Sequence, residues 1–156
     1  MASSCAALNK QAASVIVWNT EEWRISKILP FHNFTVYGLE FSPKDTYFAT
    51  VSKDRKLAVY SGAGLELLFS YEAHLRSITC LSFHLSEDLL LTGSRDKTIR
   101  LHSMSQKKQL KELMLKNPVS AVAFCQEIHF ENYFVVGCVN GALQIGKIEG
   151  EEITLL

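Results

Sequence analysis

The sequence predicts an all-β fold assembled from repeated units with a period of about 42 residues, typical of stacked supersecondary units. Asp54 and Asp96 lie one period apart, and each follows a histidine, His32 or His74, at the same spacing. Short apolar runs recur every ~8–12 residues with turn residues between them, which is typical of all-β proteins.

Composition is that of an ordinary globular domain without a strong electrostatic bias. The 156 residues include 16 basic and 16 acidic side chains, and 47% of the residues are apolar. This balance favours neither nucleic acid nor a membrane surface as a partner, and no apolar run is long enough to span a bilayer. The four cysteines form no CxxC pair, so we expect no metal site, no cofactor and a reducing compartment.

The first complete unit reads as four strands separated by turns. Ser42–Asp45, Lys53–Arg55 and Ser61–Gly64 have turn composition. Between them lie nearly continuous apolar runs, which indicate strands buried on both faces. The expected strands are 36–41, 47–51, 57–60 and 65–69.

The second unit repeats this plan, with expected strands at 78–83, 89–93, 98–101 and 109–115. The last segment, from Gln109 to Leu115, has the composition of a helix by intrinsic propensity. We nevertheless expect a strand there, because the repeat requires one.

A third unit and an N-terminal half-unit extend the pattern in both directions. Expected strands of the third unit are 119–124, 133–138, 142–148 and 153–156. Its Asn140-Gly141 pair replaces the aspartate turn, slightly more than one period after Asp96, and Asn-Gly favours a tight hairpin. At the other end, Trp18 lies one period before Tyr60, but Ala12 stands where an aspartate would be expected. The expected units are 1–30, 31–72, 73–116 and 117–156.

These motifs resemble the WD40 repeat family. A blade of that family has a histidine before its first strand, a Ser or Thr in the second, an aspartate in the tight turn and a tryptophan closing the third. The resemblance implies a partial WD40 β-propeller of about three and a half four-stranded blades. It also implies one hydrogen-bonded network in each of two blades: His32, Thr50, Asp54 and Tyr60, then His74, Thr92, Asp96 and His102. Tyr60 and His102 depart from the family tryptophan, and Gly146 ends the third strand of the last unit, where no network is expected.

Residues 4–60 resemble more narrowly the second propeller of the Elongator complex subunit two family. The resemblance rests on Ala13–Thr20, on Leu29–His32, on Leu39–Pro43 and on Val51–Arg55. It implies a non-catalytic scaffold that supports wobble-uridine modification of transfer RNA through subunit assembly. It also implies other Elongator subunits as partners, no small-molecule substrate, and a cytoplasmic and nuclear location. A generic WD40 adaptor that binds an acidic or phosphorylated peptide is the alternative.

Two sets of residues admit functional interpretations. Each His/Asp pair with a nearby hydroxyl could be a catalytic triad, but the constellation recurs at the repeat period, which favours a structural role. Lys53 and Arg55 flank Asp54, and the turn at Asp96 is likewise flanked by two cations, Arg95 and Lys97. These four side chains could bind an anionic protein or an RNA phosphate, or they could simply solvate their turns.

The number of units falls short of a closed ring. A propeller closes with about 4–8 blades, and repeat arrays need capped ends for solubility. We therefore expect the chain to be a piece of a longer protein or to be completed by another chain. Alone, it is expected to be oligomeric or prone to aggregate.

Overall fold

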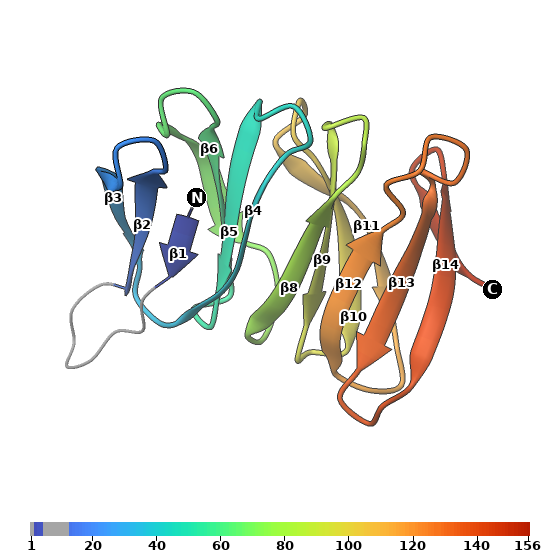
Figure 1. Cartoon of the computed structure of the whole chain (residues 1–156). Coiled ribbons are helices and arrows are strands. Elements are labelled where there is room, and N and C mark those ends of the chain that lie inside the picture. The colour runs from blue at the N-terminus through green and yellow to red at the C-terminus, as the bar shows by residue number, and fades with distance from the viewer. Residues whose placement is uncertain (1, 5–12) are drawn as a thin grey trace.

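The computed structural model describes residues 2–4 and 13–156, and within these ranges every regular element is a β-strand. Fifteen strands form four antiparallel sheets, one of three strands and three of four. The sheets stand side by side in chain order between the two ends of the molecule (Figure 1). The predicted fold class, an all-β partial propeller of four-stranded sheets, is confirmed. No helix in the described ranges could cross a membrane.

The N-terminal sheet has the order β1-β2-β3. Its strands are β1 (Ala2–Ser4), β2 (Ala13–Asn19) and β3 (Arg24–His32). Ala12, which stands in place of the expected aspartate, and Cys5 lie outside the described residues.

In each of the other three sheets, strands that are consecutive in the chain lie next to each other. The second sheet consists of β4 (Val36–Phe41), β5 (Tyr47–Ser52), β6 (Lys56–Ser61) and β7 (Leu67–Glu72). The third sheet consists of β8 (Ile78–Phe83), β9 (Leu89–Ser94), β10 (Thr98–Ser103) and β11 (Lys108–Met114). The C-terminal sheet consists of β12 (Val119–Phe124), β13 (Tyr133–Cys138), β14 (Leu143–Glu149) and β15 (Glu152–Leu155).

Most expected strands agree with the observed ones, and two of them are instructive. The segment around Gln109 is the strand β11, as predicted from the repeat, so pairing with β10 overrides its helical propensity. The strand expected at 65–69 was placed too early, because β7 begins at Leu67. Leu65 belongs to the preceding turn, where its amide donates to the Ser61 carbonyl at 2.9 Å and its φ is 53°.

The repeat period extends to irregularities of the backbone. Trp23, Leu65 and Lys107 follow one another at intervals of one period, and all have a φ of 50–53°. Arg55 and Lys97 have φ values of 72° and 71° at equivalent places in their turns. Left-handed backbone is uncommon outside glycine, so its return at the same place shows that the sheet geometry, not the residue type, dictates these turns.

Each pair of neighbouring sheets encloses an apolar core. Val15 and Val17 pack with Phe48 and Tyr60 between the N-terminal and second sheets. The second and third sheets enclose a core that includes Leu57, Val59, Ile78, Phe83 and Leu90. The third and C-terminal sheets enclose one that includes Leu91, Ile99, Leu101, Val122, Phe134 and Val136. Both faces of the two middle sheets are therefore buried, which explains their nearly continuous apolar strands.

Candidate functional site

The second sheet contains a buried network centred on His32. Nδ1 of His32 lies 2.9 Å from Asp54, and Nε2 lies 2.8 Å from the hydroxyl of Thr50. Asp54 also accepts the amides of Asn33 and Lys56, each at 3.0 Å. Burial alone would raise the pKa of Asp54, but these bonds and the charge of His32 lower it below its usual value. The turn is thereby held by its own carboxylate.

The third sheet contains a longer chain of hydrogen bonds, whose directions are those for two neutral imidazoles. Asp96 can only accept, so Nδ1 of His74 donates to it at 3.0 Å. Nε2 of His74 then accepts from the Thr92 hydroxyl at 2.8 Å. The Thr92 oxygen accepts from Nε2 of His102 at 2.8 Å, and Nδ1 of His102 accepts from the Tyr71 hydroxyl at 2.6 Å. With both imidazoles neutral, all four bonds are satisfied.

Burial supports this assignment of protons. His102 is completely buried, and burial is the main cause that lowers its pKa to about 3, with the charge of Arg100 acting in the same direction. Burial also lowers the pKa of His74, although its bond to Asp96 opposes the shift. For Asp96, burial is outweighed by hydrogen bonds from His74 and Thr98, so its pKa lies well below the usual range.

These networks do not resemble accessible catalytic triads. The hydroxyl residues Thr50 and Thr92 are fully buried, and the two histidines His32 and His74 are 1–2% exposed. A substrate has no route to either hydroxyl in this conformation. Among the described residues there is also no cluster of three or more potential metal ligands.

The residues that depart from the family pattern behave differently from one another. Burial raises the pKa of Tyr60 to about 12, and its buried hydroxyl makes no hydrogen bond within the described residues. His102 instead joins the network fully. In the C-terminal sheet, Gly146 takes the equivalent place, and the ring of Phe134 fills the space: an added Cβ at Gly146 would lie within 2.8 Å of three carbons of that ring.

Several residues of the networks are not apparent from the motifs alone. Thr98 donates to Asp96 at 2.6 Å, and the Tyr71 hydroxyl reaches His102 from the neighbouring second sheet. Ser52 and Ser94, which lie one period apart, each accept the amide two residues later in their turn at 3.1 Å. The period is a signal that could have identified this serine pair, whereas the Tyr71 contact depends on how two sheets pack.

Two carboxylates join the second sheet to the third. Glu87 accepts from the hydroxyls of Ser42 and Thr46 at 3.1 and 2.6 Å, and from the amide of Lys44. These bonds outweigh burial and lower the pKa of Glu87. Glu40 accepts the Phe83 amide at 3.4 Å, and burial raises the pKa of Glu40 to about 7.

A basic pocket lies at the junction of the second and third sheets. Its hollow of about 320 Å³ is lined by Ser77 and four cations: Lys53, Arg55, Arg76 and Arg95. The structure thus gathers three of the four cations singled out from the turns, places Lys97 outside their pocket, and adds Arg76 from the segment before β8. All four lining cations are exposed. Of these four cations, only Arg55 has an ion pair within the described residues, with Glu72 at 3.2 Å.

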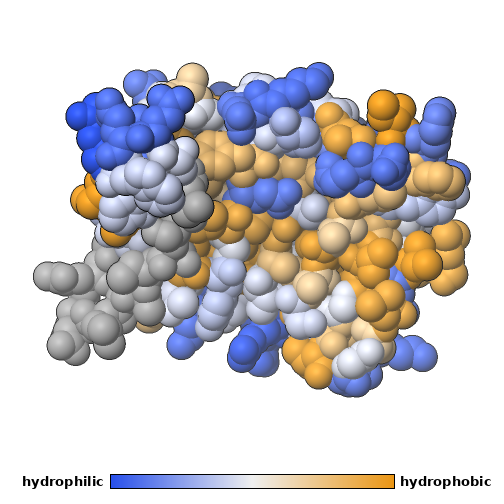
Figure 2. Space-filling view, in the orientation of Figure 1, coloured by the Kyte–Doolittle hydropathy of each residue, from blue (hydrophilic) through white to orange (hydrophobic). Residues whose placement is uncertain are grey.

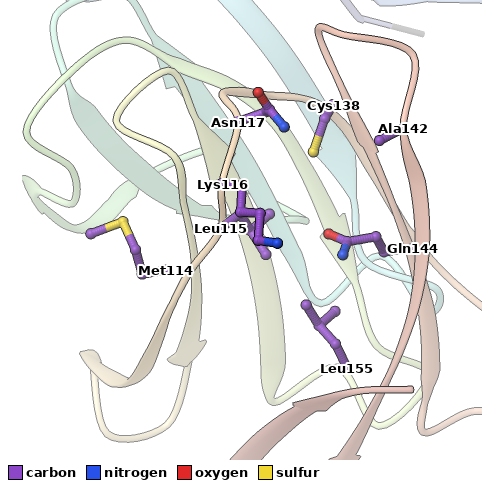
Figure 3. Close-up of a pocket in the computed structure, with 8 residues that line it drawn as sticks. All are labelled: Met114, Leu115, Lys116, Asn117, Cys138, Ala142, Gln144 and Leu155. Carbon is purple, nitrogen blue, oxygen red and sulfur yellow. The ribbon is translucent and has the colours of Figure 1, made fainter.

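Three other cavities lie between the outer strands of neighbouring sheets. One of about 290 Å³ lies between the end of β11 and the C-terminal sheet, where Lys116 and Gln144 extend toward each other (Figure 3). Others of about 450 and 490 Å³ lie beside β3 and β7. Because each pair of neighbouring sheets has such a gap, we attribute the gaps to sheets that diverge outward, not to a ligand.

Comparison with known proteins agrees with this architecture. The family model "WD domain, G-beta repeat" matches residues 23–61 and 65–103. Elongator complex protein 2 of Arabidopsis thaliana is 30% identical over the whole chain, and its Homo sapiens counterpart is 28% identical over 95% of the chain. The chain spans about a fifth of either relative, 20% in each case. The structure of U3-55K superposes with a TM-score of 0.82 at 18% identity, covering 98% of this chain and 47% of that one. With two matched repeats, a recurring His/Asp turn network and stacked four-stranded sheets, the chain belongs to the WD40 repeat family.

Proposed function

We propose that this chain is a scaffold segment of an Elongator-type complex and supports wobble-uridine modification of transfer RNA through subunit assembly. The observation that carries the proposal is the likeness to Elongator complex protein 2 along the entire chain. The burial of both His/Asp networks supports a role in binding without turnover. Scaffolding by a repeat protein uses extended surfaces and needs no reactive side chain.

Three further statements belong to this proposal. Its partners are other Elongator subunits, its location is cytoplasmic and nuclear, and its repeat units span 1–30, 31–72, 73–116 and 117–156. Sheet edges, loops at the two rims and the basic pocket are the surfaces available for such contacts.

Affinity purification of the tagged chain from its native cells tests the proposal. Mass spectrometry of the recovered proteins should find the other Elongator subunits. Asp96→Ala, which removes the acceptor for His74, should lose them because the surface is no longer folded. A folded, soluble chain that recovers no Elongator subunit would contradict the assignment.

The basic pocket favours a second candidate function, an adaptor that binds an acidic or phosphorylated peptide. Arg55, Arg76 and Arg95 can each donate in fork geometry to carboxylate or phosphate oxygens. Their position at one junction concentrates positive potential although the chain is neutral overall. Lys97, outside the pocket, would contribute only at longer range.

Fluorescence anisotropy with a phosphoserine peptide and its unphosphorylated counterpart tests the adaptor candidate. Arg76→Glu and Arg95→Glu should each weaken binding of the phosphorylated peptide by at least about tenfold, while the exposed Lys107→Glu should change it little. Equal binding of both peptides would contradict phosphate recognition. Tighter binding of a single-stranded RNA probe, lost in the same variants, would instead indicate a direct RNA contact.

A further inference from the structure

A serine lies among the cations of the basic pocket. Ser77 lines the hollow of about 320 Å³ together with Lys53, Arg55, Arg76 and Arg95. The hollow lies between the second and third sheets, each of which packs against a neighbouring sheet on both faces. Figure 2 shows hydrophilic side chains at the lower rim of the molecule, where β8 begins in Figure 1. A residue whose hydroxyl can carry a phosphate thus lies beside four cations.

The four cations have little negative charge to balance them. Of these cations, only Arg55 has an ion pair within the described residues, and both its side chain and that of Glu72 are about half exposed, so the pair contributes little. None of the described residues that line the hollow is acidic. Like charges gathered in one place repel one another and attract an anion. The pocket is therefore suited to a group that carries two negative charges.

Ser77 is accessible, and its backbone is held in place beside the cations. It belongs to the irregular segment between β7 and β8, is partly exposed, and follows the exposed residues Leu75 and Arg76. Its carbonyl accepts the amide of Arg95 at 3.0 Å and the hydroxyl of Ser94 at 2.9 Å. The segment can thus be reached by a modifying enzyme, while two arginines stay next to the modified residue.

We propose that Ser77 is a phosphorylation site whose phosphate is bound by the cations of its own pocket. A protein kinase would transfer the γ-phosphoryl group of ATP to the Ser77 hydroxyl. The new bond joins the serine oxygen to phosphorus, the bond from that phosphorus to the bridging oxygen of the β-phosphate breaks, the hydroxyl proton passes to the catalytic base of the kinase, and ADP leaves.

The product matches the pocket in charge and in hydrogen bonding. A phosphoserine carries about 1.5–2 negative charges near neutral pH and has three strong acceptor oxygens. Arginine donates to such oxygens in fork geometry, and Arg76 and Arg95 lie on two sides of the serine along the chain and across the turn. The bound phosphate would also keep an acidic peptide out of the pocket; that consequence rests on the adaptor candidate, whereas the capture of the phosphate does not.

The chain offers a matched control one period earlier. Thr35 is equivalent to Ser77, is partly exposed to a similar degree, and its carbonyl accepts the amide of Lys53 at 2.9 Å as that of Ser77 accepts the amide of Arg95. Its neighbours Phe34 and Val36 are uncharged, and Thr35 does not line the basic pocket. A phosphate at Thr35 therefore has the same backbone setting without the cluster of cations.

Phosphorus NMR on chains that carry phosphoserine in place of Ser77 or of Thr35 tests the capture of the phosphate. Free phosphoserine loses its second proton near pH 6. At position 77 the cations favour the dianion, so this pKa should be lower than at position 35 by at least about one unit. Arg76→Gln and Arg95→Gln should each reduce the difference, with folding checked by circular dichroism. Equal pKa values at the two positions would overturn the proposal.

Mass spectrometry of the chain recovered from its native cells, with phosphatases inhibited, tests whether the modification is made. It should locate phosphate on Ser77, and a chain without phosphate at that residue would overturn the assignment of a modification site. Neither measurement uses a peptide or an Elongator subunit. Failure of the proposed scaffold or adaptor function would therefore leave both results unchanged.

Discussion

Replacing His102 with tyrosine should remove a specific pH dependence of stability. His102 is fully buried with a pKa of about 3, whereas a histidine in the unfolded chain titrates near 6.5. Its folded pKa is depressed, so below pH 6.5 the unfolded chain takes up a proton that the folded protein refuses. Stability from this group is present above pH 6.5 and is lost as the pH falls toward 3.

The expected magnitude follows from the two pKa values of His102. Between pH 7 and pH 5 the loss is about 2 kcal/mol, since each pH unit below 6.5 costs about 1.4 kcal/mol. His74 contributes in the same direction, because its pKa is also lowered. Glu40 opposes both, because its pKa is raised to about 7 and its neutral form is favoured in the folded state. His74 and Glu40 are present in both the wild type and His102→Tyr. The difference in the free energy of unfolding between these two proteins therefore isolates the contribution of His102.

Urea unfolding of the wild type and His102→Tyr at pH 7 and pH 5 provides the measurement. Tyrosine occupies the equivalent place at Tyr60, one period earlier, so the sheet accepts it. From pH 7 to pH 5, the free energy of unfolding of the wild type should fall by about 2 kcal/mol more than that of His102→Tyr. His129→Gln, at an exposed position, is the control and should show no such shift. An unchanged gap for His102→Tyr would refute the assignment of a neutral imidazole to the network.

Four further predictions address single residues by urea or thermal unfolding. Glu40→Gln should stabilise the chain by about 1–2 kcal/mol more at pH 8 than at pH 5, after allowance for partial solvent screening. An equal effect of the substitution at both pH values would exclude a raised pKa for Glu40. Glu87→Ala leaves three donors of the second sheet without an acceptor and should cost about 1–3 kcal/mol, whereas a neutral effect would show that water replaces the carboxylate. Gly146→Ala should cost about 1–3 kcal/mol by overpacking, and Phe134→Leu should recover part of that loss in a double-mutant cycle; additive costs would contradict the contact. Asp96→Ala should cost about 3–5 kcal/mol and abolish folding of a marginal domain, and a well-folded variant without function would revive the catalytic interpretation.

The fold was predictable because the evidence for it is periodic and local. Apolar runs bounded by turn residues gave the bounds of β4, β8, β12 and β13 as the structure has them. The repeat also predicted β11 correctly against its helical propensity, since pairing with β10 decides its conformation. The predicted start of β7 was wrong by two residues. Leu65 has a left-handed backbone, and an apolar residue in the sequence gives no sign of that conformation.

The candidate site was predictable only within a single repeat. Spacings of 22 and 18 residues join His32 to Asp54 and Thr50, and such spacings are visible in a sequence. The contact of Tyr71 with His102 and the entry of Arg76 into the basic pocket both cross between sheets. They depend on the relative placement of two sheets, which no period within one unit encodes.

The left-handed turns at Trp23 and Lys107 give the chain an unused margin of stability. A non-glycine residue at such a φ costs about 1–2 kcal/mol. Glycine would remove that strain while adding about 0.5–1 kcal/mol of chain entropy, so each of these two exposed sites could gain up to about 1 kcal/mol. The equivalent turn at Leu65 offers no such gain, because Leu65 is buried in the core and glycine would lose its packing. The turns at Trp23 and Lys107 belong to different sheets, and gains at separated positions add, so two substitutions could strengthen two units without disturbing the apolar core.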